Sequence, residues 1–315
     1  MEASNQRTWQ VRLALMLIVG FAAAAACVVT LMWWKAPAAS GQDETSPTEP
    51  SFLVKCEFSH RAQVDPIVDF GKTTSFHMHD FFGNTTTNAN STYNTLRAGG
   101  TTCDDPGDKA AYWIPRVSWT DSSGKKTDLT ASITRFYYRL GAKSPNVDVN
   151  PHPALDTNGD GQLDDGLKIV TVQGKNVEWR CFNGTWSTTP PKQCSNGKLV
   201  VRVKFPDCLQ VDANGRPLLD SADHRSHMAD AVQPANGGKA TCPTSHPYPV
   251  PRLQTNVEFP IPTTRGKPTL SSGAYTTMHA DFFNAWDQQR LDELVQLCIN
   301  KAPFTASNPK PQECG

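Results

Sequence analysis

Residues 13–34 form an uncharged apolar run, and this run constrains the fold more than any other feature of the sequence. A helix of this length rises about 1.5 Å per residue and spans about 33 Å, close to the hydrocarbon thickness of a bilayer. Arg7 and Arg12 precede the run, and Trp33 and Trp34 end it, in the positions of a cytoplasmic positive flank and an interfacial aromatic belt. The pattern predicts a transmembrane anchor at 13–34, a cytoplasmic tail at 1–12 and an extracytoplasmic remainder.

A long signal peptide is the alternative interpretation of the same run. The apolar part of a signal peptide normally has about 7–15 residues, fewer than this run, although Ala36-Pro37-Ala38 resembles a cleavage site. The protein is therefore expected at the cell membrane, or secreted if the segment is cleaved. Residues 35–51 are rich in Pro, Ser, Thr and acidic residues, which predicts a flexible linker. Residues 52–315 are then a single extracytoplasmic domain.

Eight cysteines lie in this domain, and an even number in an oxidising compartment predicts four disulfides. Closure of short loops favours Cys181–Cys194, Cys208–Cys242 and Cys298–Cys314, which leaves Cys56 for Cys103. The spacing lacks the paired C-x-x-C of a zinc ribbon, so metal binding by these thiols is the weaker alternative.

Short runs rich in β-branched and aromatic residues recur between turn sequences, and such runs predict strands. They cover residues 64–68, 112–119, 133–140, 167–172, 199–205 and 255–261. One amphipathic helix is predicted at 286–299, because Leu291, Leu294, Val295 and Cys298 share a face. The expected fold is a mostly-β, sandwich or jelly-roll-like domain with a few short helices, stapled by disulfides.

The balance of charged residues argues against nucleic-acid binding. The chain has 30 Lys and Arg against 30 Asp and Glu, whereas a nucleic-acid binder normally needs a basic face to neutralise phosphates. We therefore expect no nucleic-acid partner. The sequence also lacks the G-x-S-x-G, P-loop and H-E-x-x-H motifs of common enzymes.

Histidines and aspartates in short polar segments are the candidate catalytic residues. His77 and His79 would share one face of a strand, about 7 Å apart, and together with carboxylates they suit Zn or Cu. Without a metal, the same groups could serve as a general base and acid. The alternative is that each caps a turn or bonds to a backbone carbonyl. The candidates are His77, His79, Asp80, His224, His227, His246, His279 and Asp281.

Two further residues are predicted to contact substrate. Arg225 is a candidate anion contact, and Trp286 is a candidate stacking surface for a sugar, although tryptophans are more often part of a core. The segments 76–82 and 278–283 also resemble each other, since both place His and Asp before Phe-Phe. We interpret this as chemical similarity between two strand or loop ends rather than as a duplication.

A separate acidic loop matches the start of an EF-hand calcium loop, D-x-N-x-D-G. Position 12 is Leu167 instead of the usual Glu, and prolines rather than a helix precede the loop. The pattern predicts a helix-free structural calcium site, and the alternative is an acidic turn that binds nothing tightly. The candidate ligands are Asp156, Asn158, Asp160, Gln162 and Asp164.

Several segments resemble the secreted domain-of-unknown-function family nineteen ninety-six, which occurs in fungi, often beside sugar-binding WSC modules, and in actinobacteria. The similar segments include Val64-Asp-Pro-Ile-Val68, His77-Met-His79-Asp-Phe-Phe-Gly83, Ala110-Ala-Tyr-Trp-Ile-Pro115, Asp220-Ser-Ala-Asp-His-Arg-Ser-His-Met228, Cys242-Pro-Thr-Ser-His-Pro247 and His279-Ala-Asp-Phe-Phe-Asn-Ala-Trp286. The acidic loop at 156–165 has no obvious counterpart in the family pattern. The resemblance implies an extracellular role facing polysaccharide and supplies no activity.

The sequence thus favours a membrane-anchored cell-surface protein that acts on envelope polysaccharide. The expected activity is that of a hydrolase or lyase with a His/Asp pocket. The alternative is a non-catalytic module that binds wall glycan or a surface partner.

Overall fold

The computed structural model describes residues 48–141, 148–235 and 240–315. All of them belong to the compact unit Thr45–Gly315. The tail and anchor predicted at 1–34, and nearly all of the linker, lie outside the described residues. None of the helices in the described ranges has the length and apolar character needed to span a bilayer.

The first of two five-stranded sheets is antiparallel and has the order β1-β7-β16-β12-β11. In β12, Leu199, Val201 and Val203 are buried on one face, and on the other face Arg202 is half-buried while Val200 is buried too, so the strand follows the alternation of a half-buried strand except at Val200. The strands are β1 (Ser51–Cys56), β7 (Ile133–Arg139), β16 (Arg252–Pro260), β12 (Lys198–Lys204) and β11 (Val177–Cys181).

The second five-stranded sheet has the order β10-β19-β4-β3-β2. Its members are β10 (Lys168–Val170), β19 (Asp281–Phe283), β4 (Ala111–Pro115), β3 (His79–Gly83) and β2 (Phe58–Ala62). The central strand β4 pairs antiparallel with both β3 and β19. Strands β3 and β19 are therefore parallel to each other and begin at the same end of the sheet.

Aromatic side chains join the two sheets in one core. Tyr112 of β4 stacks on Phe136 of β7 with ring centroids 3.8 Å apart, and Phe82 of β3 contacts the same ring. Such pairs contribute about 0.5–1.5 kcal/mol beyond the burial of their area. The other face of β4 and β3 is covered by a second apolar cluster that includes Phe81, Trp113 and Ile67. Strands β3, β4 and β19 are thus buried on both faces, whereas the edge strand β2 is only half-buried.

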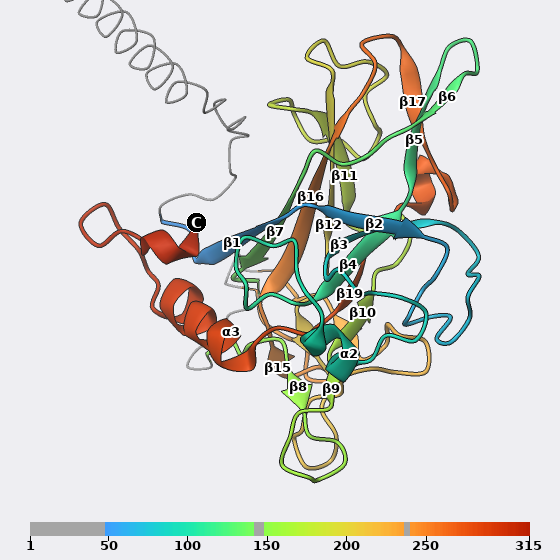
Figure 1. Cartoon of the computed structure of the whole chain (residues 1–315). Coiled ribbons are helices and arrows are strands. Elements are labelled where there is room, and N and C mark those ends of the chain that lie inside the picture. The colour runs from blue at the N-terminus through green and yellow to red at the C-terminus, as the bar shows by residue number, and fades with distance from the viewer. Residues whose placement is uncertain (1–47, 142–147, 236–239) are drawn as a thin grey trace, which may run out of the picture. The chain divides into compact units, whose positions relative to one another are not determined.

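Three smaller sheets extend from this core (Figure 1). The sheet β18-β17-β5-β6 lies at the top of the view and the hairpin β8-β9 at the bottom. The remaining strands are β5 (Val117–Asp121), β6 (Lys126–Asp128), β17 (Gly266–Leu270), β18 (Gly273–Ala274), β8 (Ala154–Leu155), β9 (Asp165–Gly166), β13 (Cys208–Leu209), β14 (Met228–Ala229) and β15 (Tyr248–Pro249).

Helices in the described ranges are short, so the prediction of a mostly-β domain with few helices is confirmed. They are α2 (Tyr93–Ala98), α3 (Gln288–Val295), a π-helical continuation (Gln296–Asn300) and 3-10 turns at Tyr275–Thr277 and Gln312–Cys314. The helix predicted at 286–299 is α3 with its continuation, and all four residues of its predicted apolar face are buried. Asp287 begins α3 by accepting a hydrogen bond from the backbone N–H of Arg290.

The strand predicted at 64–68 is wrong, because this segment is a turn. Pro66 has no N–H to offer a neighbouring strand. Asp65 instead accepts hydrogen bonds from the backbone N–H groups of Ile67 and Val68, both at 2.9 Å. A side chain that bonds to nearby backbone in this way favours a turn over a strand.

All four predicted disulfides are present: Cys56–Cys103, Cys181–Cys194, Cys208–Cys242 and Cys298–Cys314. Since such bridges form and persist in oxidising compartments, they indicate an extracellular domain.

These bridges predict the thiol content of the protein. Labelling of the denatured, unreduced chain should find no reactive thiol other than Cys27, because the other eight cysteines are paired. Loss of one bridge should lower the free energy of unfolding by about 2–5 kcal/mol. Four or more reactive thiols per chain would contradict both the bridges and the oxidising compartment.

Candidate metal centre

Two strand ends bring the first candidate residues together. His79 begins β3 opposite Pro115 of β4, and Asp281 begins β19 opposite Trp113 of the same strand. His77 and His279 lie two residues before these positions, and residues two apart along an extended chain project from the same face. The shared end of the sheet therefore carries three histidines and one aspartate on one face.

The three imidazoles converge on one point. One ring nitrogen from each of His77, His79 and His279 lies within 4.8 Å of the other two. The Nε2 atoms of His77 and His279 are 3.3 Å apart. The ring centroids of His77 and His79 are 4.3 Å apart, so three potential ligand atoms face a common space.

Backbone carbonyls orient two of these rings. Nδ1 of His79 donates to the carbonyl of Val64, and Nδ1 of His279 donates to that of Thr277, both at 2.9 Å. With the proton on Nδ1, the lone pair of each ring is on Nε2. Metal-binding histidines are commonly held this way, by a second hydrogen bond that fixes the tautomer.

Two carboxylates adjoin the histidines. One oxygen of Asp281 lies 3.8 Å from Nε2 of His279, and Asp65, His79 and Asp281 form a second group with atoms within 4.8 Å. Because Nε2 of His79 has only one lone pair, the two overlapping groups suit one shared ion rather than two. The structure thus offers three imidazoles and the carboxylate of Asp281 to a single cation, and Asp65, which already accepts two backbone hydrogen bonds, lies beside them.

Buried polar atoms without partners lie at this point. Both carboxylate oxygens of Asp281 and Nε2 of His79 are buried and find no hydrogen-bond partner among the described residues. Such atoms cost about 1–3 kcal/mol each when left unsatisfied, and more for a charged group. A bound cation would satisfy all three atoms.

The electrostatics of the site favour neutral histidines. Burial lowers the pKa of His79 to about 3 and that of His279 to about 4. Burial also raises the pKa of Asp281 well above its ordinary range. Neutral imidazole is the form that binds metal, and a cation beside Asp281 would compensate the charge that burial disfavours.

The cluster opens into a cavity of about 330 Å³, lined by His77, His279, Asp65, Asp281, Arg225 and Phe76 among others. This volume is at the lower end of the range of about 300–1,000 Å³ for ligand sites. The cation site would therefore be accessible to a small ligand or to one part of a larger one.

A family model described as "Domain of unknown function (DUF1996)" matches residues 65–286 of the 315. The chain belongs to this family. The comparisons with curated proteins and with solved structures give no match. All six cavity residues named above lie within the matched part of the DUF1996 domain.

Asp80 lies on the other face of its strand, away from the cavity. Nε and Nη2 of Arg61 donate to its two carboxylate oxygens at 2.5 and 3.0 Å, and the carboxylate is fully buried. Consecutive residues of a strand point to opposite faces, so His79 and Asp80 cannot both reach one pocket. In this placement Asp80 belongs to a structural ion pair.

The other three candidate histidines support a loop of the DUF1996 domain instead of lining the cavity. His227 is buried, with Ser221 Oγ at 2.9 Å from Nδ1 and the carbonyl of Lys168 at 2.7 Å from Nε2. His246 bonds to the carbonyl of Ser226, and His224 bonds to Asp220. These contacts anchor the segment 220–228, which carries Arg225 into the cavity. The predicted anion contact therefore shares the cavity with His77, His279 and Asp281.

Trp286 is placed where no glycan can reach it. Its side chain is fully buried against Phe52 and Tyr138, and its Nε1–H donates to the Tyr138 hydroxyl at 2.9 Å. A sugar-stacking role needs an exposed ring face, so this placement corrects the predicted substrate contact. The residue is part of the main core.

Sequence reasoning missed Asp65 and Phe76 as site residues. Asp65 lies in one of the segments that carries the family resemblance, and this was the available signal. Phe76 is 86% exposed at the cavity. Phe76 begins the segment 76–82 that resembles 278–283, and this was the available signal.

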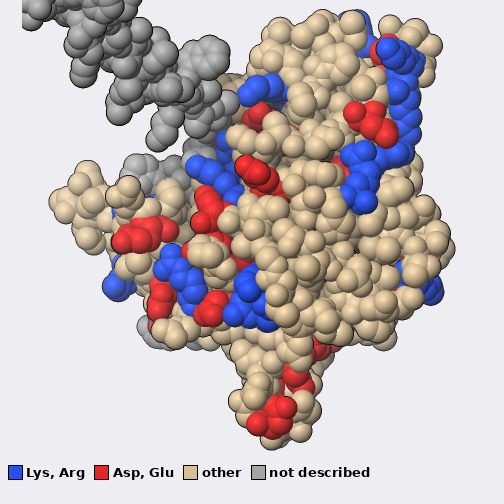
Figure 2. All heavy atoms as spheres, in the orientation of Figure 1, with Lys and Arg blue, Asp and Glu red and all other residues tan. Residues whose placement is uncertain are grey.

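The acidic loop at 156–165 projects from the hairpin β8-β9, and Figure 2 shows acidic side chains at the tip of this projection. Its side-chain oxygens accept local backbone hydrogen bonds: Asp156 from Gly159 and Gly161, Asn158 from Asp160, and Asp160 from Gln162. The loop is not among the close groups of ligand atoms found in the described ranges. Calcium binding here stays a prediction.

Chelation tests this prediction. If Asp156, Asn158, Asp160 and Asp164 hold calcium, a chelator should lower the melting temperature and calcium should restore it. Binding to the native state alone adds about 2.7 kcal/mol at a hundredfold excess over Kd. Asp160→Ala should abolish this response, and an unchanged melting curve at millimolar calcium would reduce the loop to a turn.

Proposed function

We propose that the domain binds one divalent transition-metal ion, zinc or copper, through His77, His79 and His279, with Asp281 as a further ligand. The observation that carries this proposal is the convergence of three imidazoles on a buried carboxylate whose oxygens have no other partner among the described residues. Nitrogen and oxygen donors of this kind suit these metals. The eight cysteines of the domain are paired in disulfides and cannot serve as ligands. The metal must therefore be one that imidazole and carboxylate ligands can hold, as zinc and copper are.

We further propose that the centre serves a hydrolase or lyase directed at cell-envelope polysaccharide. A bound ion would supply Lewis acidity, or a water molecule with a lowered pKa. His77 and His279 would hold that ion at the wall of the cavity, where a substrate can reach it. Asp65 faces the same space, held in place by two backbone N–H groups. It would accept the proton of the attacking water, or of the carbon acid in an elimination.

The proposed roles narrow the expectations from sequence at two positions. His79, expected either as a metal ligand or as a general base, is a ligand in this proposal, because its Nδ1 is committed to Val64 and its Nε2 lies at the cluster. Asp65 takes the proton-accepting role, and Asp80, expected as an acid or an orienting group, has no part in the site because Arg61 holds it. The proposed location of this activity is the extracytoplasmic side of the cell membrane, through an anchor at 13–34.

Release of saccharide fragments from envelope polysaccharide tests the activity. The metal-loaded protein should release fragments, chelation should stop the release and zinc or copper should restore it. Asp65→Asn should reduce release strongly while metal content, measured by mass spectrometry, stays unchanged. Glycan binding without release, unaffected by any substitution of the three histidines, would contradict the enzyme and favour a non-catalytic binding module.

A further inference from the structure

The cavity beside the metal centre carries features that the proposed chemistry does not use. Arg225 lines it, and its side chain is exposed and makes no ion pair or hydrogen bond with another described residue. Phe76 stands at the same cavity with 86% of its surface exposed, and Val68 beside it is 43% exposed. A charged group and an exposed ring without partners at one site indicate a ligand.

The charges around the cavity leave Arg225 uncompensated. Asp69 is already paired with Lys72 at 2.7 Å and accepts a hydrogen bond from Ser75. Asp65 and Asp281 line the metal side of the cavity, and neither forms an ion pair with Arg225. Arg225 is therefore a cationic side chain at this cavity without an ion pair among the described residues, and it would attract an anion. A guanidinium matches the geometry of a carboxylate or phosphate group with two parallel hydrogen bonds.

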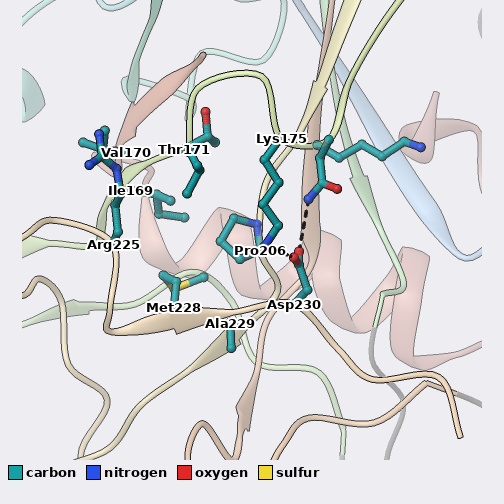
Figure 3. Close-up of a pocket in the computed structure, with 12 residues that line it drawn as sticks. Ile169, Val170, Thr171, Lys175, Pro206, Arg225, Met228, Ala229 and Asp230 are labelled. Carbon is teal, nitrogen blue, oxygen red and sulfur yellow. Dashed lines mark hydrogen bonds and ion pairs between the residues drawn. The ribbon is translucent and has the colours of Figure 1, made fainter. Parts of the chain in front are cut away.

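Arg225 also borders a neighbouring hollow. This second hollow of about 70 Å³ shares Val170 and Arg225 with the cavity. Figure 3 shows Arg225 beside Val170, with Lys175 and Asp230 facing each other in this second hollow. Lys175 is neutralised by Asp230 at 2.7 Å, which leaves Arg225 as the anion contact at the junction.

We infer that the substrate is an anionic saccharide, and this inference rests on the proposed polysaccharide-directed function. Arg225 pairs with its carboxylate or phosphate group, and Phe76 stacks on a sugar ring. Aromatic faces pack well on the apolar face of a ring with little conformational cost. The two contacts lie on different segments, 76 on the loop before β3 and 225 on the loop before β14, and both reach the metal cavity. Arg225 is a binding residue here, and the reacting atoms belong to the metal centre.

Calorimetric titration of the zinc-loaded protein with three hexasaccharides tests this inference. The probes are oligogalacturonate, phosphorylated maltohexaose and neutral maltohexaose. At least one charged probe should bind about 10-fold or more tightly than the neutral one, because the free energy of a hydrogen bond to a charged group corresponds to a factor of about this size in affinity. The preferred charged probe identifies the source of the anion as carboxylate or phosphate. The preference should weaken with added salt, since charge attraction is screened.

Matched variants assign the contacts. Arg225→Gln should remove the preference for the charged probe, whereas Lys126→Gln, on the exposed strand β6, should keep it. Phe76→Ala should weaken charged and neutral probes by a similar factor, and Phe76→Tyr should restore binding. Equal affinity for all three probes, a preference that survives Arg225→Gln, or no binding of any probe would each overturn the inference.

Metal content of the same samples separates the two proposals. Arg225→Gln should keep its zinc, so its loss of binding belongs to the anion contact. A wild-type protein that holds zinc and releases fragments, but shows no charge preference, overturns only the anionic substrate. A wild-type protein that takes up no metal overturns the proposed function itself.

Discussion

Replacing His77 by alanine should abolish stable binding of zinc or copper. His77 supplies one of the three converging imidazoles and is only half-buried, so the fold should survive its removal. Loss of an outer-shell partner alone costs about 10–100-fold in metal affinity, and loss of a ligand should cost more. Mass spectrometry of the dialysed protein and calorimetric titration with each metal measure the effect.

Asp281→Asn tests the same centre through its carboxylate, and its expected effects on metal binding and on stability have opposite signs. This change should also weaken metal binding, but it should raise the melting temperature of the metal-free protein. The reason is that it removes a carboxylate that is costly to bury without a partner. A purely structural carboxylate would not show the two effects together.

His246→Ala is the matched control, because His246 lies outside the cluster and is half-buried, as His77 is. It should bind metal as the wild type does. Full metal occupancy in both His77→Ala and His279→Ala would contradict the metal centre.

Replacing Arg61 by alanine should lower the free energy of unfolding by about 3–5 kcal/mol, the cost of leaving a buried charge without its partner. Arg61 is the partner of Asp80, whose carboxylate is fully buried and whose pKa burial raises despite this ion pair. Arg61 also donates to the carbonyl of Leu129 at 2.7 Å. Denaturant unfolding of the wild type and the variant measures the difference.

Arg97→Ala is the control for this prediction. Its partner Asp287 is 46% exposed and stays solvated when the arginine is lost, so the cost should be up to about 1 kcal/mol. Metal content should be unchanged in both variants, since neither residue faces the cluster. A loss of metal in Arg61→Ala with little loss of stability would instead assign Asp80 a role at the centre.

Local pattern was sufficient for much of the fold. The alternation in 199–205 and the 3.6-residue period in 286–299 each depend on neighbours in sequence, and both became the expected elements. The disulfides were also predictable, because closing a short loop costs less entropy than closing a long one. The turn at 64–68 was mispredicted where one side chain, Asp65, competed with strand pairing for the backbone.

The candidate site, like the fold, was only partly predictable from the sequence. The sequence by itself determined the residue types, His and Asp in short polar segments, and the two-residue spacing that places His77 beside His79. Only the tertiary structure decided which segments meet. Strand β4 pairs with both β3 and β19, and this pairing joins His79 to His279 across 200 positions of sequence while turning Asp80 to the opposite face. Strand order is set by the packing of whole sheets, which no short segment encodes, so the partners of His79 could not be read from its neighbours.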